Sequence, residues 1–387
     1  MAVLQEPSPE PIGEVNIHDS TAAFETWLRE QLSDRGTCDE AALQDKHADM
    51  KTGGAHVFLR GTFYRWAELW KDVTDGGARV AAVGDTNVEN FGTWRDQEGR
   101  LVWGVNDFDD ACEMPWTSDL VRLGVSTILA LDALERFKLS EEDACDAIWD
   151  GYAKAIASGD AAPLVLAEKH RVLREFALTL ILSRPPDMFW EKREAKLTAA
   201  RNMPADARTA LQAALLDGAA NVEFLQPKPG DAPGMGSRGK RRFYALATWN
   251  GAKILRETKP VVPSAMAWAK ARGAGPGIEE MLASSRRCPD PFQQIRGKWI
   301  VRRLAADSSK IELGDLDRAG ADNHMKRKVF ESMGAEIGNL HLGSISPATL
   351  RRELKARGDA GGAWLRKAAK DWARKVKEDF AEFCRDA

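Results

Sequence analysis

Two short polar stretches hold side chains that can bind a metal ion and accept a proton. Asp85 and Asn90 lie in GDTNVENFG, after an apolar run, and Asp107 lies in GVNDFDDA, after another. Carboxylate and amide oxygens suit Mg²⁺ beside phosphates, and a nearby carboxylate can accept the proton of an attacking hydroxyl. Phosphoryl transfer needs these groups besides a phosphate clamp. The alternative interpretation of the first stretch is an Asx-turn whose side chains cap their own backbone.

These acids need a frame that brings them together. RVAAVGD and RLVWGVNDFD are apolar runs that end in acids and each predict a short strand, and RDQEG between them is typical of a turn. We therefore expect an acid-bearing hairpin over residues 79–110. Its expected metal ligands are Asn90, Asp107 and Asp109.

The rest of the chain alternates between helical and β-like patterns. Apolar spacing predicts helices over residues 20–50, 117–215 and from 324 onward, and β-like character followed by a helix over residues 56–70. QPKPGDAPGMGSRG is a Pro- and Gly-rich loop, and Asn250-Gly251 marks a hairpin turn. We expect four regions: a flexible tail at 1–20, a helical catalytic half at 21–225, a β-rich lobe at 226–315 and a helical segment at 316–387.

Composition argues against several classes of partner. The net charge of the 387-residue chain is −3, which gives no electrostatic case for nucleic acid. No apolar run approaches the ~20 residues that span a bilayer, so no membrane partner is expected. Five cysteines are scattered without a CxxC pair, which suits reduced thiols. We expect a cytoplasmic protein, and the sequence leaves its oligomeric state open.

GDTNVENFG resembles the catalytic loop of the aminoglycoside-phosphotransferase and choline-kinase branch of the protein-kinase-like superfamily, whose pattern is H-G-D-x-H-x-x-N. Gly84, Asp85 and Asn90 match this pattern. Val83 and Asn87 stand where the pattern has histidines, which leaves the acceptor open.

Two further motifs follow in the order of that superfamily. NDFDD resembles its metal-binding motif, and the resemblance implies that Asp107 holds the metal. PWTSDLVRL resembles the next helix start, where the acid, here Asp119, braces the catalytic loop.

A kinase-like fold needs a Gly-rich loop and a lysine before the catalytic loop, and residues 1–83 offer neither. GMGSRG occurs later, and its backbone N–H groups are expected to cover phosphates. The expected phosphate cation is one of Lys253, Arg256 and Lys259. The expected nucleotide-binding residues are Gly234, Gly236, Ser237, Gly239, Lys259 and Arg256. The fold class expected from this order is α+β: a two-lobed, circularly permuted protein-kinase-like fold with a mainly helical catalytic lobe and a small antiparallel-sheet nucleotide lobe.

The whole arrangement is similar to a bacterial family filed as domain-of-unknown-function 2252, over roughly residues 40–345. The shared segments are FLRG, GDTNVENFG, NDFDD, GMGSRG, KPVVPS and RRLAADSSK. In that register Lys259 is the family lysine. Residues expected to bind substrate or support the site are Arg60, Asn87, Asp119, Arg302 and Lys310.

The resemblance implies an ATP- and Mg²⁺-dependent phosphotransferase that acts on an unidentified small-molecule hydroxyl or amine. Two alternatives stay open: transfer of AMP onto a protein, and nucleotide binding without catalysis. The expected partners are a nucleotide and a small-molecule acceptor.

Overall fold

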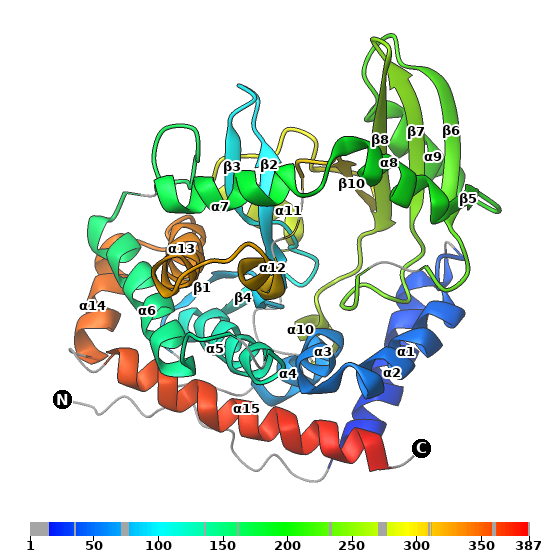
Figure 1. The fold of residues 1–387 in the computed structure, drawn as a ribbon. Helices are drawn as coiled ribbons and strands as arrows, with labels where there is room; N and C mark the ends of the chain where they lie inside the picture. Colours follow the sequence, from blue (N-terminus) through cyan, green and yellow to red (C-terminus); the bar gives the residue numbers. More distant parts are fainter. Residues whose placement is uncertain are drawn as a thin grey trace.

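In a computed structural model the chain is described at residues 15–34, 36–70, 77–134, 137–160, 162–231, 234–269, 277–308, 310, 312–357 and 361–385. Helices and small antiparallel sheets give a mixed α+β architecture, with a six-stranded sheet at the upper right and most helices below it (Figure 1). The tail expected at 1–20 lies outside the described residues up to residue 14, and its last part already belongs to a helix.

Four helices open the described chain: α1 (Ile17–Ser33), α2 (Glu40–Thr52), α3 (Gly54–Gly61) and α4 (Phe63–Trp70). Asp39 caps α2, so the helical region expected at 20–50 is two helices. The β-like character expected at the start of 56–70 is wrong. Phe58 and Leu59 lie in α3 and are buried in the main core, where packing overrides the β propensity of the segment.

The acid-bearing region differs from the expected hairpin in its strand pairing. Its elements are β1 (Arg79–Ala82), the 3₁₀ turn η1 (Val88–Asn90), β2 (Phe91–Arg95), β3 (Leu101–Val105) and β4 (Cys112–Pro115). The hairpin is β2–β3, with its turn at the expected place, whereas β1 pairs with β4. The reason is Gly84, whose φ of +81° turns the chain out of β1 before Asp85.

Helices make up most of the remaining chain. They are α5 (Trp116–Asp132), α6 (Glu141–Ser158), α7 (Arg171–Leu182), α8 (Pro186–Ala195), α9 (Ala205–Ala213), α10 (Ala265–Trp268), α11 (Ile278–Ser284), α12 (Leu313–Arg318), α13 (Asn323–His341), α14 (Pro347–Arg357) and α15 (Gly361–Arg385). α6 and α13 approach so closely that a Cβ on Gly151 would overlap the carbonyl oxygen of Glu331, and one on Gly334 that of Ile148. α13 ends beside β1, where the Ser344 hydroxyl accepts a backbone N–H of β1 at 2.8 Å.

A six-stranded antiparallel sheet carries the other candidate residues. Its strands, in order across the sheet, are β5 (Leu197–Ala199), β6 (Ala220–Pro227), β7 (Phe243–Trp249), β8 (Ala252–Pro260), β10 (Trp299–Leu304) and β9 (Gln294–Arg296). Asn250 and Gly251, with φ of +48° and +81°, form the expected turn between β7 and β8. The sheet begins at β5, before the boundary expected at residue 226. One face, with Phe243 and Trp299, packs on α9.

The first and last described helices lie together. His18 Nε2 is 3.2 Å from the carbonyl oxygen of Glu382, and the His18 ring stacks on Phe383. α15 runs along the base of the helical part (Figure 1) and buries Leu365 and Trp372 in the main core. None of the described helices is long and apolar enough to cross a membrane.

Candidate functional site

Asp119 holds the start of the loop that carries Asp85. The Asp119 carboxylate accepts the N–H of Val83 at 2.7 Å, the N–H of Gly84 at 3.0 Å and the hydroxyl of Thr86 at 2.7 Å. His341 Nε2, from the end of α13, lies 3.1 Å from the same carboxylate. Burial raises the pKa of Asp119, but these hydrogen bonds and His341 outweigh it and lower the pKa below its usual range. The buried Asp119 carboxylate is therefore ionised, and in that form it fixes the loop.

Asp85 is paired with a buried arginine that the sequence analysis did not single out. Arg122, on α5, donates to Asp85 Oδ1 through Nη2 and, at 3.1 Å, through Nε. Its guanidinium carbon lies 5.0 Å from the ring centroid of Phe63 and 5.1 Å from that of Trp66. Burial raises the pKa of Asp85, and this effect is larger than the lowering caused by the positive charge of Arg122. The place of Arg122 one turn after Asp119 was the signal that could have revealed it.

Asn90 is oriented with its oxygen available. Its Nδ2 donates to the backbone oxygen of Asp85 at 2.6 Å, and within the described residues its Oδ1 accepts no hydrogen bond. Asn87 serves its own loop instead, because its Oδ1 accepts the Glu89 N–H at 3.1 Å and its Nδ2 donates to the Asp85 oxygen at 3.2 Å. Asn87 thus caps η1, and Asn90 keeps the oxygen that a hard cation needs.

The three acids of NDFDD have different surroundings. Asp107 is the most open, with a side chain 25% exposed and Lys259 Nζ at 3.6 Å. Asp109 is held by Lys259 Nζ at 2.6 Å and Lys240 Nζ at 3.3 Å. Asp110 accepts the first backbone N–H of α10 at 2.9 Å, and burial raises its pKa to about 6. Asp107 is therefore the acid best placed for a cation, whereas Asp109 already has two ammonium partners.

The Gly-rich loop reaches the acid of the first motif. A Cβ on Gly236 would lie 3.1 Å from Asp85 Oδ2 and 3.4 Å from the backbone oxygen of Arg60. Ser237 is buried, and its hydroxyl accepts a hydrogen bond from Arg242. Gly239 has a φ of +97° and packs against Leu43 of α2 instead of facing the acids. Gly234 lines the large cavity described below, so the loop splits its contacts between cavity, Asp85 and α2.

The two faces of β8 separate the three cations that were candidates for phosphate binding. Lys259 is buried beside Asp107 and Asp109, as described above. Arg256 lies on the opposite face, where its Nε donates to the oxygen of Ala214 at 3.0 Å, so the structure does not bring it to the acids. Lys253 lies near the turn of the β7–β8 hairpin and pairs with Glu194. Of these three, only Lys259 joins the site.

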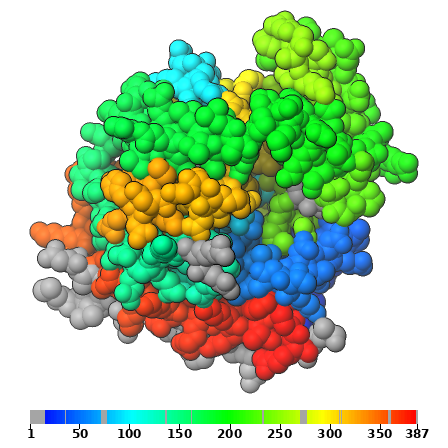
Figure 2. All heavy atoms as spheres, viewed as in Figure 1, coloured from blue at the N-terminus to red at the C-terminus, as the bar shows by residue number. Residues whose placement is uncertain are grey.

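A cavity of about 1350 Å³ opens beside these residues. It runs between the sheet, the α7–α8 segment and α12, where the surface is hollowed (Figure 2). Arg302 lines it and donates to Glu257 at 2.7 Å, and Arg60 lines it and pairs with Glu89 at 2.8 Å. Lys310 also lines it, and burial lowers the pKa of Lys310. The basic residues of the lining are Arg60, Arg184, Lys192, Arg193, Lys196, Arg238, Arg242, Arg287, Arg302, Arg303, Lys310 and Arg318.

A cation at Asp107 would depend on a ligand that brings its own oxygens. Within the described residues, no cluster of three or more His, Cys, Asp or Glu side chains could hold a metal ion alone. Asn90 Oδ1 and Asp107 are oxygen donors of the kind that Mg²⁺ takes when substrate phosphates complete its shell. The donor set therefore fits a phosphate-bound Mg²⁺ better than an all-protein metal site.

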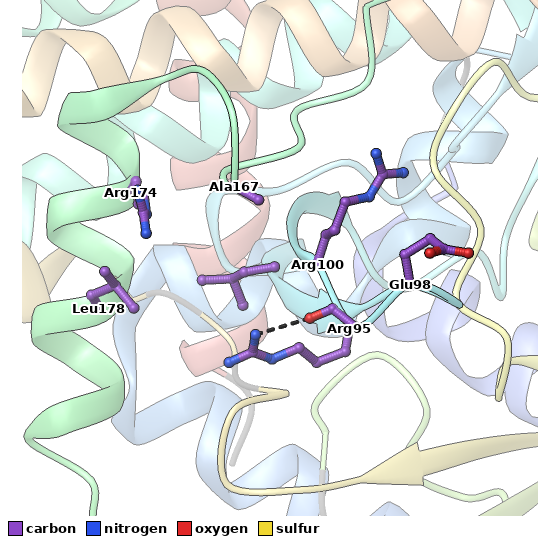
Figure 3. Close-up of a pocket in the computed structure, with 8 residues that line it drawn as sticks. Arg95, Glu98, Arg100, Ala167, Arg174 and Leu178 are labelled. Carbon is purple, nitrogen blue, oxygen red and sulfur yellow. Dashed lines mark hydrogen bonds between the residues drawn. The ribbon is translucent and has the colours of Figure 1, made fainter.

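A smaller pocket of about 270 Å³ lies between the β2–β3 turn and α7 (Figure 3). Two of its three arginines have protein partners: Arg95 pairs with Asp307 at 2.7 Å, and Arg100 with Asp96 at 2.8 Å. None of the expected site residues lines this pocket, so we assign it no role.

Comparison with known proteins locates the resemblance in one part of the chain. No curated protein and no solved structure matches the chain. Residues 38–179 match the model of a protein family described as "Uncharacterized protein conserved in bacteria (DUF2252)". The match includes Asp85, Asn90 and Asp107, whereas the Gly-rich loop and Lys259 lie beyond it. The part of the chain that carries both acid-bearing motifs is thus similar to that bacterial family.

Proposed function

We propose that this protein is an ATP- and Mg²⁺-dependent phosphotransferase with a circularly permuted kinase-like fold. One observation carries the proposal: the Gly-rich loop and Lys259, from the second half of the chain, meet Asp85 and Asp107 from the first half. A Gly-rich loop, a lysine, a carboxylate pair and an amide oxygen are the parts that phosphoryl transfer requires. The basic lining of the adjoining cavity suits the phosphates of a nucleotide.

The path of the chain supports the permutation. α13 ends at His341, which contacts Asp119, and Ser344 just beyond it contacts Ala81 of β1, so the end of α13 lies beside the strand before Asp85. With the chain ends joined, as in an unpermuted order, α13 would precede β1, with α14, α15 and α1–α4 between them. The contact of α1 with α15 brings the first and last described helices together, which is the condition under which permuted chains keep their fold.

Each residue has a role that follows from its position. Asp85 orients the acceptor hydroxyl and takes its proton. Asn90 Oδ1 and Asp107 hold Mg²⁺ against the phosphates. Backbone N–H groups around Gly236 would cover the phosphates, and Lys259 would supply the cation for them.

Turnover of ATP by purified protein tests the proposal. We expect Mg²⁺-dependent loss of ATP that Asp107→Asn lowers at least about 100-fold, because Asp107 is the proposed ligand of a metal ion whose charge stabilisation is worth several kcal/mol. Asp206→Asn, at an exposed acid of α9 away from the cavity, is the matched control and keeps wild-type turnover. Equal turnover by Asp107→Asn and wild type would show that the acid assignment is wrong.

Product analysis separates the two transfer reactions. Mass spectrometry of the acceptor shows an added phosphate for the proposed reaction and an added AMP for nucleotidyl transfer. The departures from the catalytic-loop pattern at Val83 and Asn87 keep the second reaction open. Binding of ATP without either product would identify a nucleotide-binding protein without catalysis.

A further inference from the structure

Arg287 is a buried arginine without a protein partner. Its side chain follows α11 and lines the large cavity, yet the residue is only 8% exposed. Among the described residues, no hydrogen-bond acceptor or carboxylate contacts its guanidinium, and Nε and Nη1 are both buried and unsatisfied. A buried charge without a partner costs several kcal/mol or more, and buried polar groups in folded proteins almost always have partners. The lack of one here calls for a ligand.

Aromatic rings hold the guanidinium in place. Its carbon lies 4.4 Å from the ring centroid of Trp94 and 4.8 Å from that of Phe108. Stacking on rings fixes the plane of the group but leaves its N–H donors unused. Phe108 directly follows Asp107, so the arginine stacks on the residue next in sequence to the candidate metal ligand.

The neighbourhood has other unused polar atoms. Trp94 Nε1 and Asn106 Oδ1 are buried and without a hydrogen-bond partner, and both residues line the same cavity as Arg287. Arg287 and Trp94 thus offer N–H donors, whereas the unused atom of Asn106 is an acceptor. The acids whose charges most affect the pKa of Arg287 are Glu336 and Asp290. Neither forms an ion pair with Arg287 within 4.0 Å. Asp290 Oδ1 already accepts the N–H of Phe292 at 2.9 Å.

We propose that Arg287, with Trp94, forms a subsite of the large cavity for the carboxylate or phosphate group of a small molecule. A planar guanidinium with free donors matches either group. The subsite is distinct from the nucleotide site proposed at Lys259 and Asp107, and it does not depend on the proposed phosphotransfer.

Binding of inorganic phosphate and of acetate, in separate titrations at constant ionic strength, tests the subsite. The readout is the rise of the thermal unfolding midpoint with anion concentration, fitted to an apparent Kd. We expect a saturable rise with at least one of the two anions, and an affinity at least tenfold lower in Arg287→Met. Arg287→Lys keeps the charge but loses the fork, and falls in between.

Arg303→Met is the matched control, since Arg303 lines the same cavity and stacks on Phe292 at 5.0 Å but donates to Ser308. If the subsite is specific, Arg303→Met binds the anion with an affinity within about twofold of wild type. An equal loss in both variants, or none in Arg287→Met, overturns the proposal. Competition between the anion and a non-hydrolysable ATP analogue with Mg²⁺ also overturns it, because the anion then occupies the nucleotide site. Additive binding supports a separate subsite.

A second measurement addresses the alternative that Arg287 is present only to balance Glu336 through water. In that case Arg287→Met destabilises the protein, and Arg287→Met/Glu336→Gln restores its stability. The proposed subsite predicts the opposite for the unliganded protein: Arg287→Met is neutral or stabilising, because it removes a buried charge that has no hydrogen-bonded partner. Urea unfolding without added anions decides between them. Coupling of the two substitutions would overturn the proposal.

Discussion

At the scale of single residues, Arg122 shows how an unremarked side chain shapes the candidate site. Its guanidinium binds Asp85 Oδ1 and, at 2.9 Å, the backbone oxygen of Leu59, so it ties α5 to the acid-bearing loop and to α3. The sequence marked Asp85 because its motif is distinctive. The position of Arg122 one turn after Asp119 was a weaker signal, because an arginine on a helix is ordinary until the fold buries it.

Replacing Arg122 tests this pairing. Arg122→Met leaves the buried carboxylate of Asp85 without its partner, which should lower the free energy of unfolding by about 3–5 kcal/mol. Asp85→Asn removes the charge, so the double variant Arg122→Met/Asp85→Asn should lose less than the sum of the single losses. Urea unfolding of the four proteins measures this coupling, and additive losses would contradict the pairing.

Lys46 gives a prediction about pH. This buried lysine of α2 lacks a carboxylate within 4.0 Å among the described residues, and burial lowers its pKa from 10.5 to about 8. Below pH 8 the lysine is charged in both states, and the folded state bears the cost of burying the charge. Between pH 8 and 10.5 the folded protein loses the proton first, so the stability contribution of Lys46 rises with pH.

Lys46→Met is therefore expected to stabilise the protein at pH 7, by up to about 3 kcal/mol. The difference between variant and wild type should shrink as the pH rises to 10.5. Urea unfolding at several pH values gives both curves, and parallel curves would refute the explanation.

At the scale of elements, the close approach of the Gly-rich loop to Asp85 predicts the effect of one methyl group. The Cβ of Gly236→Ala would contact Asp85 Oδ2 at 3.1 Å. We expect turnover to fall at least about tenfold while the free energy of unfolding changes by less than about 1 kcal/mol. The control is Gly277→Ala, where a Cβ meets nothing within 4 Å. Unchanged turnover in Gly236→Ala would separate the loop from the reaction.

Elements were predicted from sequence with uneven success, for physical reasons. The strands around Asn250-Gly251 were correct because turn chemistry and apolar alternation agree there. The β-like segment before Phe63 was wrong because its apolar residues fit a helix face as well as a strand. The partner of β1 was wrong because pairing across a long connection leaves no local signal in the sequence.

At the scale of the whole molecule, two distant segments of the chain share one site. The acids come from residues 85–110, and Lys240 and Lys259 come from beyond the Pro- and Gly-rich loop. The order of motifs in the sequence suggested this assembly. The sequence could not predict that Asp109 would take both lysines, or that Arg256 would face α9, because the direction of each side chain depends on strand register.

The most direct test of the central claim is a crystal structure with Mg²⁺ and a non-hydrolysable ATP analogue. We predict Mg²⁺ bound by Asn90 Oδ1 and Asp107, phosphates beneath the backbone around Gly236, and Lys259 Nζ on a phosphate oxygen. An analogue bound away from Asp107, or held by only one of the two segments, would contradict the claim that they form a single nucleotide site.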